Sequence, residues 1–317
     1  MNAGARMFRS STFLAAICAT LQAATAADAI KVAIGSGGNL EAFIAEIGKQ
    51  GGFFEKQGLT PEIFYTAGGG ETLQAVISQS AQIGVSLGSS GAIGAFAKGA
   101  PLRIIGASAI GSAVYWYVRA DSPIKTMQDI AGKTLAYSTT GSGSHSVALQ
   151  VRSRGIDAKL VATGATPATF TQVMTGQVDV GMAYPEFGQD ALARGQTRYL
   201  FKDNDFERIR KQAIRVIATH KALPEDIGAR FMRAYLDSVN WIYSDDPRPL
   251  QIYAALANVD LPLARKLRDE FWSREIFTLE KVQGLDIIMA DAIEGKFISR
   301  PLTPAEIDAL IVPSARP

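Results

Sequence analysis

One short segment of this chain occurs twice, and the two copies lie 97 positions apart (169 − 72 and 181 − 84). The first copy runs from Thr72 to Val85 and the second from Thr169 to Met182. In each copy the pattern predicts a short helix after a Gly- or Pro-containing turn, then a polar turn and an apolar strand. Two copies are too few for a solenoid. The repeat therefore indicates two similar α/β lobes with a cleft between them, where small-molecule sites most often lie.

The first 26 residues have the features of a secretory signal peptide. Arg6 and Arg9 provide a positively charged start, residues 13–19 form a short apolar core, and residues 24–26 (Ala-Thr-Ala) have the small-x-small form that a signal peptidase cleaves. We expect cleavage after Ala26 or Ala27. The apolar core is well short of the ~20 residues that cross a bilayer, and no later segment reaches that length. The sequence therefore predicts a soluble periplasmic protein.

The only cysteine, Cys18, lies within this signal. A lipid anchor on Cys18 is the alternative, but Ile17 fits poorly at a position where such anchors need a small residue. The mature chain then has no thiol for a disulfide or a Cys-metal site, which matters little because a chain of this length buries a large core. Cleavage also removes two arginines and leaves 30 basic and 30 acidic residues. This balance argues against a nucleic-acid partner.

The rest of the chain alternates predicted strands, glycine-rich loops and helices, as in a mainly parallel sheet flanked by helices. An extended segment at 115–118 leads into the second lobe, where a short helix is expected at 126–133, and an apolar strand at 213–219 returns to the first. From Pro224 onward the periodicity is helical. We therefore expect an α/β fold in which lobe I comprises 28–111 and 213–317, with a helical C-terminal extension, and lobe II comprises 112–212. Two crossing segments would form a hinge.

Four glycine-rich loops precede predicted helices at equivalent places in both lobes. A helix N-terminus has unpaired N–H groups and favours an anion by roughly 0.3–1 kcal/mol when exposed, and glycine lets a ligand approach the backbone. For any single loop a simple helix cap is the alternative. Four together favour a ligand site at the carboxyl ends of the strands. The candidate residues are Gly37, Gly38, Asn39, Gly69, Gly70, Ser89, Ser90, Thr140, Gly141, Ser142 and Gly143.

Several motifs resemble those of type II periplasmic solute-binding proteins of ABC importers. They lie at residues 99–106 (GAPLRIIG), 121–133 (DSPIKTMQDIAGK), 141–145 (GSGSH) and 176–181 (GQVDVG). The most similar branch is the nitrate/sulfonate/taurine type, which also includes binders of thiamin pyrimidine precursors. The resemblance covers nearly the whole mature chain and implies a two-lobed type II periplasmic binding fold. The motifs specify the fold and general role well, but they do not name the ligand.

The resemblance also adds side chains to the candidate site. Tyr184 and Glu186 follow the strand of the second repeat, where the family usually contacts its ligand; Tyr184 would stack on or hydrogen-bond a planar solute. Glu186 either pairs with a cationic group or caps the next helix, and if it faces the cleft it opposes a simple anion. Trp116 is either a wall of the pocket or a core residue. His145 is either a pocket donor or a solvated cap residue.

The sequence departs from the family pattern at Gln82. This residue corresponds by the 97-residue offset to Asp179, and the family often has Asp at that position, supporting the turn before the strand. The substitution therefore raises a question about local support of the first lobe rather than about function.

The expected function is capture of a small polar or anionic solute, such as a sulfonate, nitrate, a carboxylate or a heteroaromatic compound. The partners would be a membrane permease and its ATPase, and the protein would be a monomer without cofactor, metal or catalytic residue. His145 and His220 lie far apart, and the chain has no zinc-protease motif, P-loop or nucleophile elbow. A ligand sensor for a signalling partner is one alternative. A pyrimidine-synthase-like enzyme is another, although its cysteine-rich motif is missing.

Overall fold

Residues 27–312 are described in a computed structural model, and the predicted signal peptide with Cys18 lies outside them. Five strands form the sheet of lobe I, in the order β2-β1-β3-β10-β4. β1 pairs in parallel with β2 and β3, whereas β10 is antiparallel to both β3 and β4. One strand in five therefore runs against the others. The strands are β1 (Asp28–Gly35), β2 (Leu59–Thr66), β3 (Ile83–Gly88), β4 (Leu102–Ala109) and β10 (Arg215–His220).

Lobe II repeats this arrangement with five other strands. β6 pairs in parallel with β7 and is joined to the start of β8 by a parallel bridge between Leu135 and Val180. β5 is antiparallel to both β8 and β9, which gives the order β7-β6-β8-β5-β9. The prediction of two mainly parallel α/β lobes is confirmed. The strands are β5 (Tyr115–Arg119), β6 (Thr134–Tyr137), β7 (Lys159–Ala162), β8 (Gly181–Ala183) and β9 (Thr197–Lys202).

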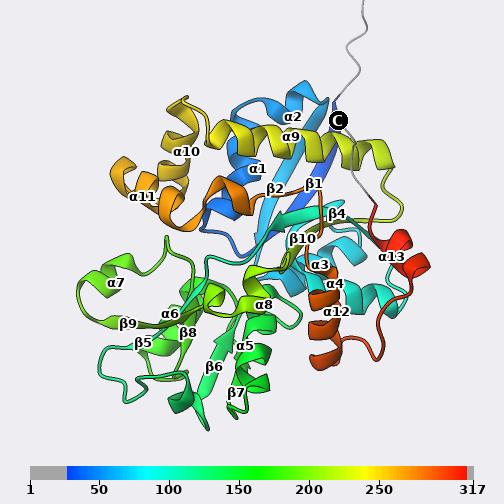
Figure 1. Cartoon of the computed structure of the whole chain (residues 1–317). Coiled ribbons are helices and arrows are strands. Elements are labelled where there is room, and N and C mark those ends of the chain that lie inside the picture. The colour runs from blue at the N-terminus through cyan, green and yellow to red at the C-terminus, as the bar shows by residue number, and fades with distance from the viewer. Residues whose placement is uncertain (1–26, 313–317) are drawn as a thin grey trace, which may run out of the picture.

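Helices flank both sheets, and most of those after β10 lie on lobe I, as Figure 1 shows. Lobe I carries α1 (Leu40–Gln50), α2 (Phe53–Lys56), α3 (Gly69–Ile77), α4 (Ser89–Ala97), α9 (Glu225–Ile242), α10 (Arg248–Ala257), α11 (Leu261–Phe271), the 3-10 turn Arg274–Ile276, α12 (Leu285–Glu294) and α13 (Pro304–Leu310). Lobe II carries α5 (Gly143–Ser153), α6 (Thr166–Met174) and α7 (Gln189–Ala193). A 3-10 turn, Asp203–Asp205, and α8 (Glu207–Arg210) follow β9.

The short helix expected at 126–133 is only a 3-10 turn, Gln128–Ile130. The carboxylate of Asp129 accepts hydrogen bonds from the backbone N–H groups of Lys125 and Thr126, at 2.9 and 2.8 Å. Aspartate side chains that bind nearby backbone in this way favour turns over helix. Gly132, with a φ of +74°, then ends the segment.

The sequence repeat is also a repeat of hydrogen bonds. The hydroxyls of Thr66 and Thr72 are 2.8 Å apart, and those of Thr163 and Thr169, 97 positions later, are 2.7 Å apart. The second threonine of each pair lies in the first turn of the duplicated helix. Its hydroxyl also donates to the backbone carbonyl four residues earlier, at 3.3 Å in both lobes. Equivalent side chains therefore tie each duplicated helix to the strand before it.

Gln82 supports its strand in the same way as its counterpart Asp179. Gln82 Oε1 accepts from the backbone N–H of Lys31 at 2.6 Å, and Asp179 Oδ2 accepts from that of Thr134 at 2.8 Å. Lys31 lies on β1 and Thr134 on β6, which hold equivalent places in the two sheets. The amide oxygen of glutamine thus preserves the support that aspartate gives in lobe II.

The two segments that cross between the lobes are bonded to each other. Gly111 N–H donates to Gln212 O at 3.0 Å, and Ser112 N–H donates to Asn204 Oδ1 at 3.0 Å. One segment leads from β4 to β5 and the other from β9 to β10. Within residues 27–312, no helix is both long and apolar enough to cross a membrane.

Candidate functional site

A small cavity of about 10 Å³ lies where the strand ends of the two lobes meet. This volume is close to the minimum that holds a single water molecule. The lobes are therefore closed on each other, and a larger solute would enter only if they separated. The lining residues are Gly35, Ser36, Gly69, Ser86, Val114, Ser138, Ser142, Gly143, Ser144, Met182, Tyr184 and Arg215.

Five of these lining residues are serines, two from lobe I and three from lobe II. Ser36 and Ser86 both have left-handed backbone, with φ of +57° and +61°. This conformation is uncommon for residues other than glycine and concentrates at functional sites. Ser142 is the N-cap of α5, and its Oγ accepts from His145 N–H at 3.2 Å. The cavity is thus surrounded by neutral groups that both donate and accept hydrogen bonds.

The charged group at the cavity is Arg215, which is 3% exposed. Its Nη2 lies 2.7 Å from Oε2 of Glu41, which is 1% exposed, and its Nε is 3.0 Å from both carboxylate oxygens. Nη1 donates to Ser112 Oγ at 3.2 Å, and Ser86 Oγ donates to Glu41 at 2.8 Å. Burial acts against the charge of Arg215, but Glu41, Tyr184 and Asp203 together outweigh it and raise the pKa of the guanidinium. The positive charge at the cavity is therefore compensated mainly within lobe I.

Glycines allow the lobes to approach one another closely. A Cβ added at Gly91 on α4 would lie 2.6 Å from Gly141 O in lobe II, and one added at Gly70 on α3 would collide with Thr140 O, also in lobe II. Gly70 N–H donates across the lobes to Thr139 Oγ1 at 2.9 Å. The glycines at these loops thus serve the contact between lobes as well as the cavity lining.

Replacing Gly91 with alanine should prevent full closure of the lobes. Alanine is favoured over glycine in a helix by about 1 kcal/mol, so any opening would come from the contact with Gly141 rather than from damage to α4. We expect a larger radius of gyration for Gly91→Ala by small-angle X-ray scattering. Gly228→Ala is the matched control, because a Cβ on this α9 glycine meets only Ile105, at 3.7 Å. Equal radii for the two variants would contradict this account.

Glu186 follows β8 in lobe II, but its side chain accepts hydrogen bonds from lobe I. Its Oε1 accepts from Leu40 N–H at 2.7 Å, Tyr253 OH at 2.8 Å and Trp272 Nε1 at 2.8 Å. The residue is 9% exposed, and burial raises the pKa of its carboxyl to about 7. Glu186 therefore occupies the N-terminus of α1, a position that a negatively charged or polar group stabilises.

Four of the predicted site residues line the cavity, namely Gly69, Ser142, Gly143 and Tyr184. Burial raises the pKa of Tyr184 to about 12, so its hydroxyl stays protonated at neutral pH. Tyr184 also stacks on Trp272, with ring centroids 6.3 Å apart.

The remaining predicted loop residues lie next to the cavity or apart from it. Asn39 is the N-cap of α1, where its Oδ1 accepts from Ala42 N–H at 3.1 Å. Gly37 faces the ring of Tyr65, and Gly38 is exposed. Ser89 Oγ donates to the backbone O of Ala213. Ser90 is buried at the start of α4, Thr140 is exposed, and Gly141 contacts α4, as described above.

The two remaining aromatic candidates, Trp116 and His145, also lie outside the cavity lining. Trp116 is fully buried within lobe II, where it stacks on Phe201 at 5.3 Å and donates from Nε1 to Asp203 at 2.7 Å. His145 stacks on Tyr137 at 4.4 Å and accepts at Nδ1 from Gly141 N–H. Burial lowers the pKa of His145 to about 4, so the imidazole is neutral near pH 7.

Five polar residues that line the cavity were not predicted from the sequence: Arg215, Ser36, Ser86, Ser138 and Ser144. Arg215 had a readable signal, because it is the one charged residue in the apolar run 213–218. A charge within a buried strand needs a partner of opposite charge. That partner is Glu41, which lies in the first turn of α1. The serines had no comparable signal, since serine is common in loops.

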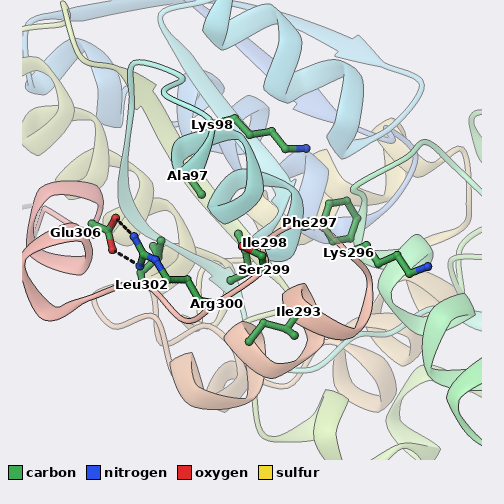
Figure 2. Close-up of a pocket in the computed structure, with 10 residues that line it drawn as sticks. All are labelled: Ala97, Lys98, Ile293, Lys296, Phe297, Ile298, Ser299, Arg300, Leu302 and Glu306. Carbon is green, nitrogen blue, oxygen red and sulfur yellow. Dashed lines mark hydrogen bonds and ion pairs between the residues drawn. The ribbon is translucent and has the colours of Figure 1, made fainter.

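A larger cavity, of about 630 Å³, lies away from the facing strand ends (Figure 2). It is bounded by the end of α4, the end of α12 and the start of α13. Arg300 and Glu306 in its wall pair with each other at 2.8 Å. Its lining comes from lobe I alone, so lobe closure would not form it. Within residues 27–312, no group of three or more His, Cys, Asp or Glu side chains could hold a metal ion.

Solved structures share this fold across nearly the whole chain. The alkanesulfonate-binding protein SsuA from Xanthomonas axonopodis pv. citri, bound to MOPS, matches with a TM-score of 0.72 and 15% identity over 90% of this chain and 98% of that one. The periplasmic aliphatic sulphonate binding protein SsuA from Escherichia coli matches at 0.65 and 19%, over 91% and 93%. The periplasmic nitrate-binding protein NrtA from Synechocystis PCC 6803 matches at 0.67 and 12%, over 89% and 86%.

These likenesses confirm the predicted type II periplasmic binding fold. A search of curated protein sequences finds no significant match. The family model described as NMT1/THI5 like matches residues 43–248, which is more than half of the chain. The chain therefore belongs to the NMT1/THI5-like family.

Proposed function

We propose that this protein is the periplasmic solute-binding component of an ABC importer. The observation that carries the proposal is the cavity between the lobes, which receives strand ends and helix N-termini from both sides. The proposed lobes are residues 28–111 with 213–317, and 112–212. A signal peptide over residues 1–26 would direct the chain to the periplasm. The closed form would deliver its solute to a membrane permease with its ATPase.

Closure gives this protein a way to signal that it is loaded. The cavity between the closed lobes is about the size of one water molecule, so a bound solute must hold the lobes slightly farther apart or displace side chains. Contacts from both lobes to one solute exist only when the cleft is shut, so binding shifts the population toward a closed form. A permease that recognises the closed form as a bound solute shapes it, rather than the tighter closed form of the empty chain, would accept loaded protein in preference to empty protein.

The lining favours a small polar solute that accepts hydrogen bonds from hydroxyls and backbone N–H groups. Five serine hydroxyls and two helix N-termini surround the space, and the charge of Arg215 is balanced by Glu41. The candidate solutes are sulfonates, nitrate, carboxylates and heteroaromatic compounds, of which sulfonates and nitrate are named for the proteins of similar fold. A hydrogen-bonding site discriminates strongly, because an analogue that lacks a polar group leaves buried partners unpaired.

The test is a thermal-shift screen of the chain from Asp28 against nitrate, alkyl- and arylsulfonates, aromatic carboxylates and pyrimidine precursors. A ligand at a hundredfold excess over its Kd stabilises the native state by about 2.7 kcal/mol, which raises the melting temperature measurably. We expect one chemical class to raise it. Absence of a shift with every class would count against capture of these solutes and would reopen the ligand class together with the sensor and enzyme alternatives.

A matched pair of variants then locates the binding site of the solute identified. Ser144→Leu places a bulky side chain in the cavity lining and should reduce affinity at least a hundredfold by titration calorimetry. Ser153→Leu, on the exposed end of the same helix, should bind normally. Unchanged affinity in folded Ser144→Leu would place the site elsewhere.

A further inference from the structure

The closed arrangement of the lobes has a specific polar link that no solute provides. Glu186 belongs to the loop after β8 in lobe II, yet its Oε1 accepts three hydrogen bonds from lobe I. The donors come from three separate elements: the N-terminus of α1 (Leu40), the middle of α10 (Tyr253) and the residue after α11 (Trp272). Donors that converge from three elements on one atom form a built binding site for a carboxyl group.

The acceptor at this site is buried together with its donors. Tyr253 and Trp272 are fully buried, and Leu40 is also 0% exposed. If the lobes separated, water would have to replace the carboxyl oxygen at all three donors. A donor left unpaired in a closed structure is destabilising. The lobes therefore either stay closed around Glu186 or open far enough to hydrate the whole site.

We propose that Glu186 is a latch by which lobe I holds lobe II closed in the absence of solute. The inference rests on the lobe movement of the proposed function, and it adds that part of the closing free energy comes from the protein itself. Other polar contacts also join the lobes, among them Gly70 to Thr139 at 2.9 Å, Gln150 to Asp291 at 2.7 Å, and the ion pairs of Arg208 on α8 with Asp291 and Glu294 on α12. Glu186 differs from these because one oxygen collects three donors.

The latch implies a balance between empty and loaded protein. Without it, an empty chain would be mostly open, and only solute would close the cleft. With it, the empty chain already samples the closed form, so the solute must supply less of the free energy of closure. The solute must, however, widen a closed cavity that is about the size of one water molecule. Weakening the latch should therefore change the open population of the empty protein before it changes anything else.

The experiment measures the distance between the lobes without solute. Because the mature chain has no cysteine, a single pair introduced by Lys49→Cys on α1 and Arg194→Cys after α7 can be spin-labelled specifically. Both positions are exposed. Distances would be recorded by double electron–electron resonance at pH 5.5, where the buried carboxyl of Glu186 is protonated in the closed form.

Tyr253→Phe is the informative variant, and Tyr235→Phe is its matched control. Both remove one hydroxyl from a buried tyrosine of lobe I, but Tyr235 donates within its own lobe, to Glu41 O at 3.3 Å. We expect Tyr253→Phe to raise the open-to-closed ratio about tenfold, which corresponds to about 1.4 kcal/mol, and Tyr235→Phe to leave it unchanged. Glu186→Ala should open most molecules, whereas Glu186→Gln, which keeps the acceptor oxygen, should stay closed.

The result can go against the latch in two ways. Identical distance distributions for the two tyrosine variants would overturn it, as would a wild-type chain that is as open as Glu186→Ala. Circular dichroism of each variant confirms that it is folded. Because no solute is used, failure here leaves solute capture standing, and failure of the solute screen leaves the latch standing.

Discussion

Glu41→Gln lowers the free energy of unfolding by about 3–5 kcal/mol, the loss expected when one partner of a buried ion pair is removed. Arg215 is 3% exposed and is held by three N–O contacts of 2.7–3.0 Å to Glu41. Glutamine keeps the shape of the side chain but leaves the buried guanidinium without a compensating charge. Urea denaturation followed by circular dichroism measures the loss.

Two controls separate charge from shape in this experiment. Glu46→Gln changes the same residue type on the same helix, at a partly exposed position, and should alter stability by less than about 0.5 kcal/mol. The double variant Glu41→Leu with Arg215→Met removes both charges and should recover most of the lost stability, because a buried pair can be replaced by apolar residues at little cost. A loss below about 1 kcal/mol in Glu41→Gln would mean that the pair is not stabilising.

The closed-to-open ratio of the solute-free chain should fall roughly a hundredfold as the pH rises from about 4.5 to about 7. Burial raises the pKa of Glu186 from its ordinary value of 4.5 to about 7 in the closed form. In the open form the carboxyl meets water and keeps its ordinary pKa. The closed form therefore binds more protons between these two values, so acid favours closure and the loss is complete above about pH 7.

The groups that face Glu186 do not titrate in this range. Tyr253 on α10, Tyr115 on β5 and Tyr184 on its own loop all have pKa values raised by burial, so their hydroxyls stay protonated. Asp203 and His145 do titrate within or near this range, so the comparison must be made against Glu186→Gln. The same spin-label distances recorded across pH would show a slope in the wild type that the Gln variant lacks. Parallel pH profiles would assign the titration to another group.

The fold was largely predictable because its signals are local. Apolar runs, glycine loops and each copy of the repeated segment fit within windows of about fifteen residues. The return strand predicted at 213–219 corresponds to β10. The prediction was wrong at 126–133, where the carboxylate of Asp129 binds nearby backbone and the chain forms a 3-10 turn instead of the predicted helix. Side-chain competition of this kind leaves no trace in hydrophobic periodicity.

The candidate site was less predictable because it depends on distant partners and on backbone conformation. Glu41 and Arg215 are 174 positions apart, and no local pattern pairs them. Ser36 and Ser86 line the cavity through left-handed backbone that sequence alone does not indicate. Glu186 takes neither of its two expected roles, since its carboxyl caps a helix of the opposite lobe instead of pairing with a cationic group or capping the helix that follows it.

The central position of β10 also determines the order in which the lobes can be completed. β10 lies between β3 and β4, and the neighbouring residues Ser89 and Ala213 are separated by 124 positions of chain. Until residues 215–220 have been synthesised or exported, β3 and β4 each have an unpaired edge, which is a liability for aggregation. All five strands of lobe II precede β10 in the chain. The inserted lobe is therefore the one that can finish folding first, and the N-terminal lobe must wait for it.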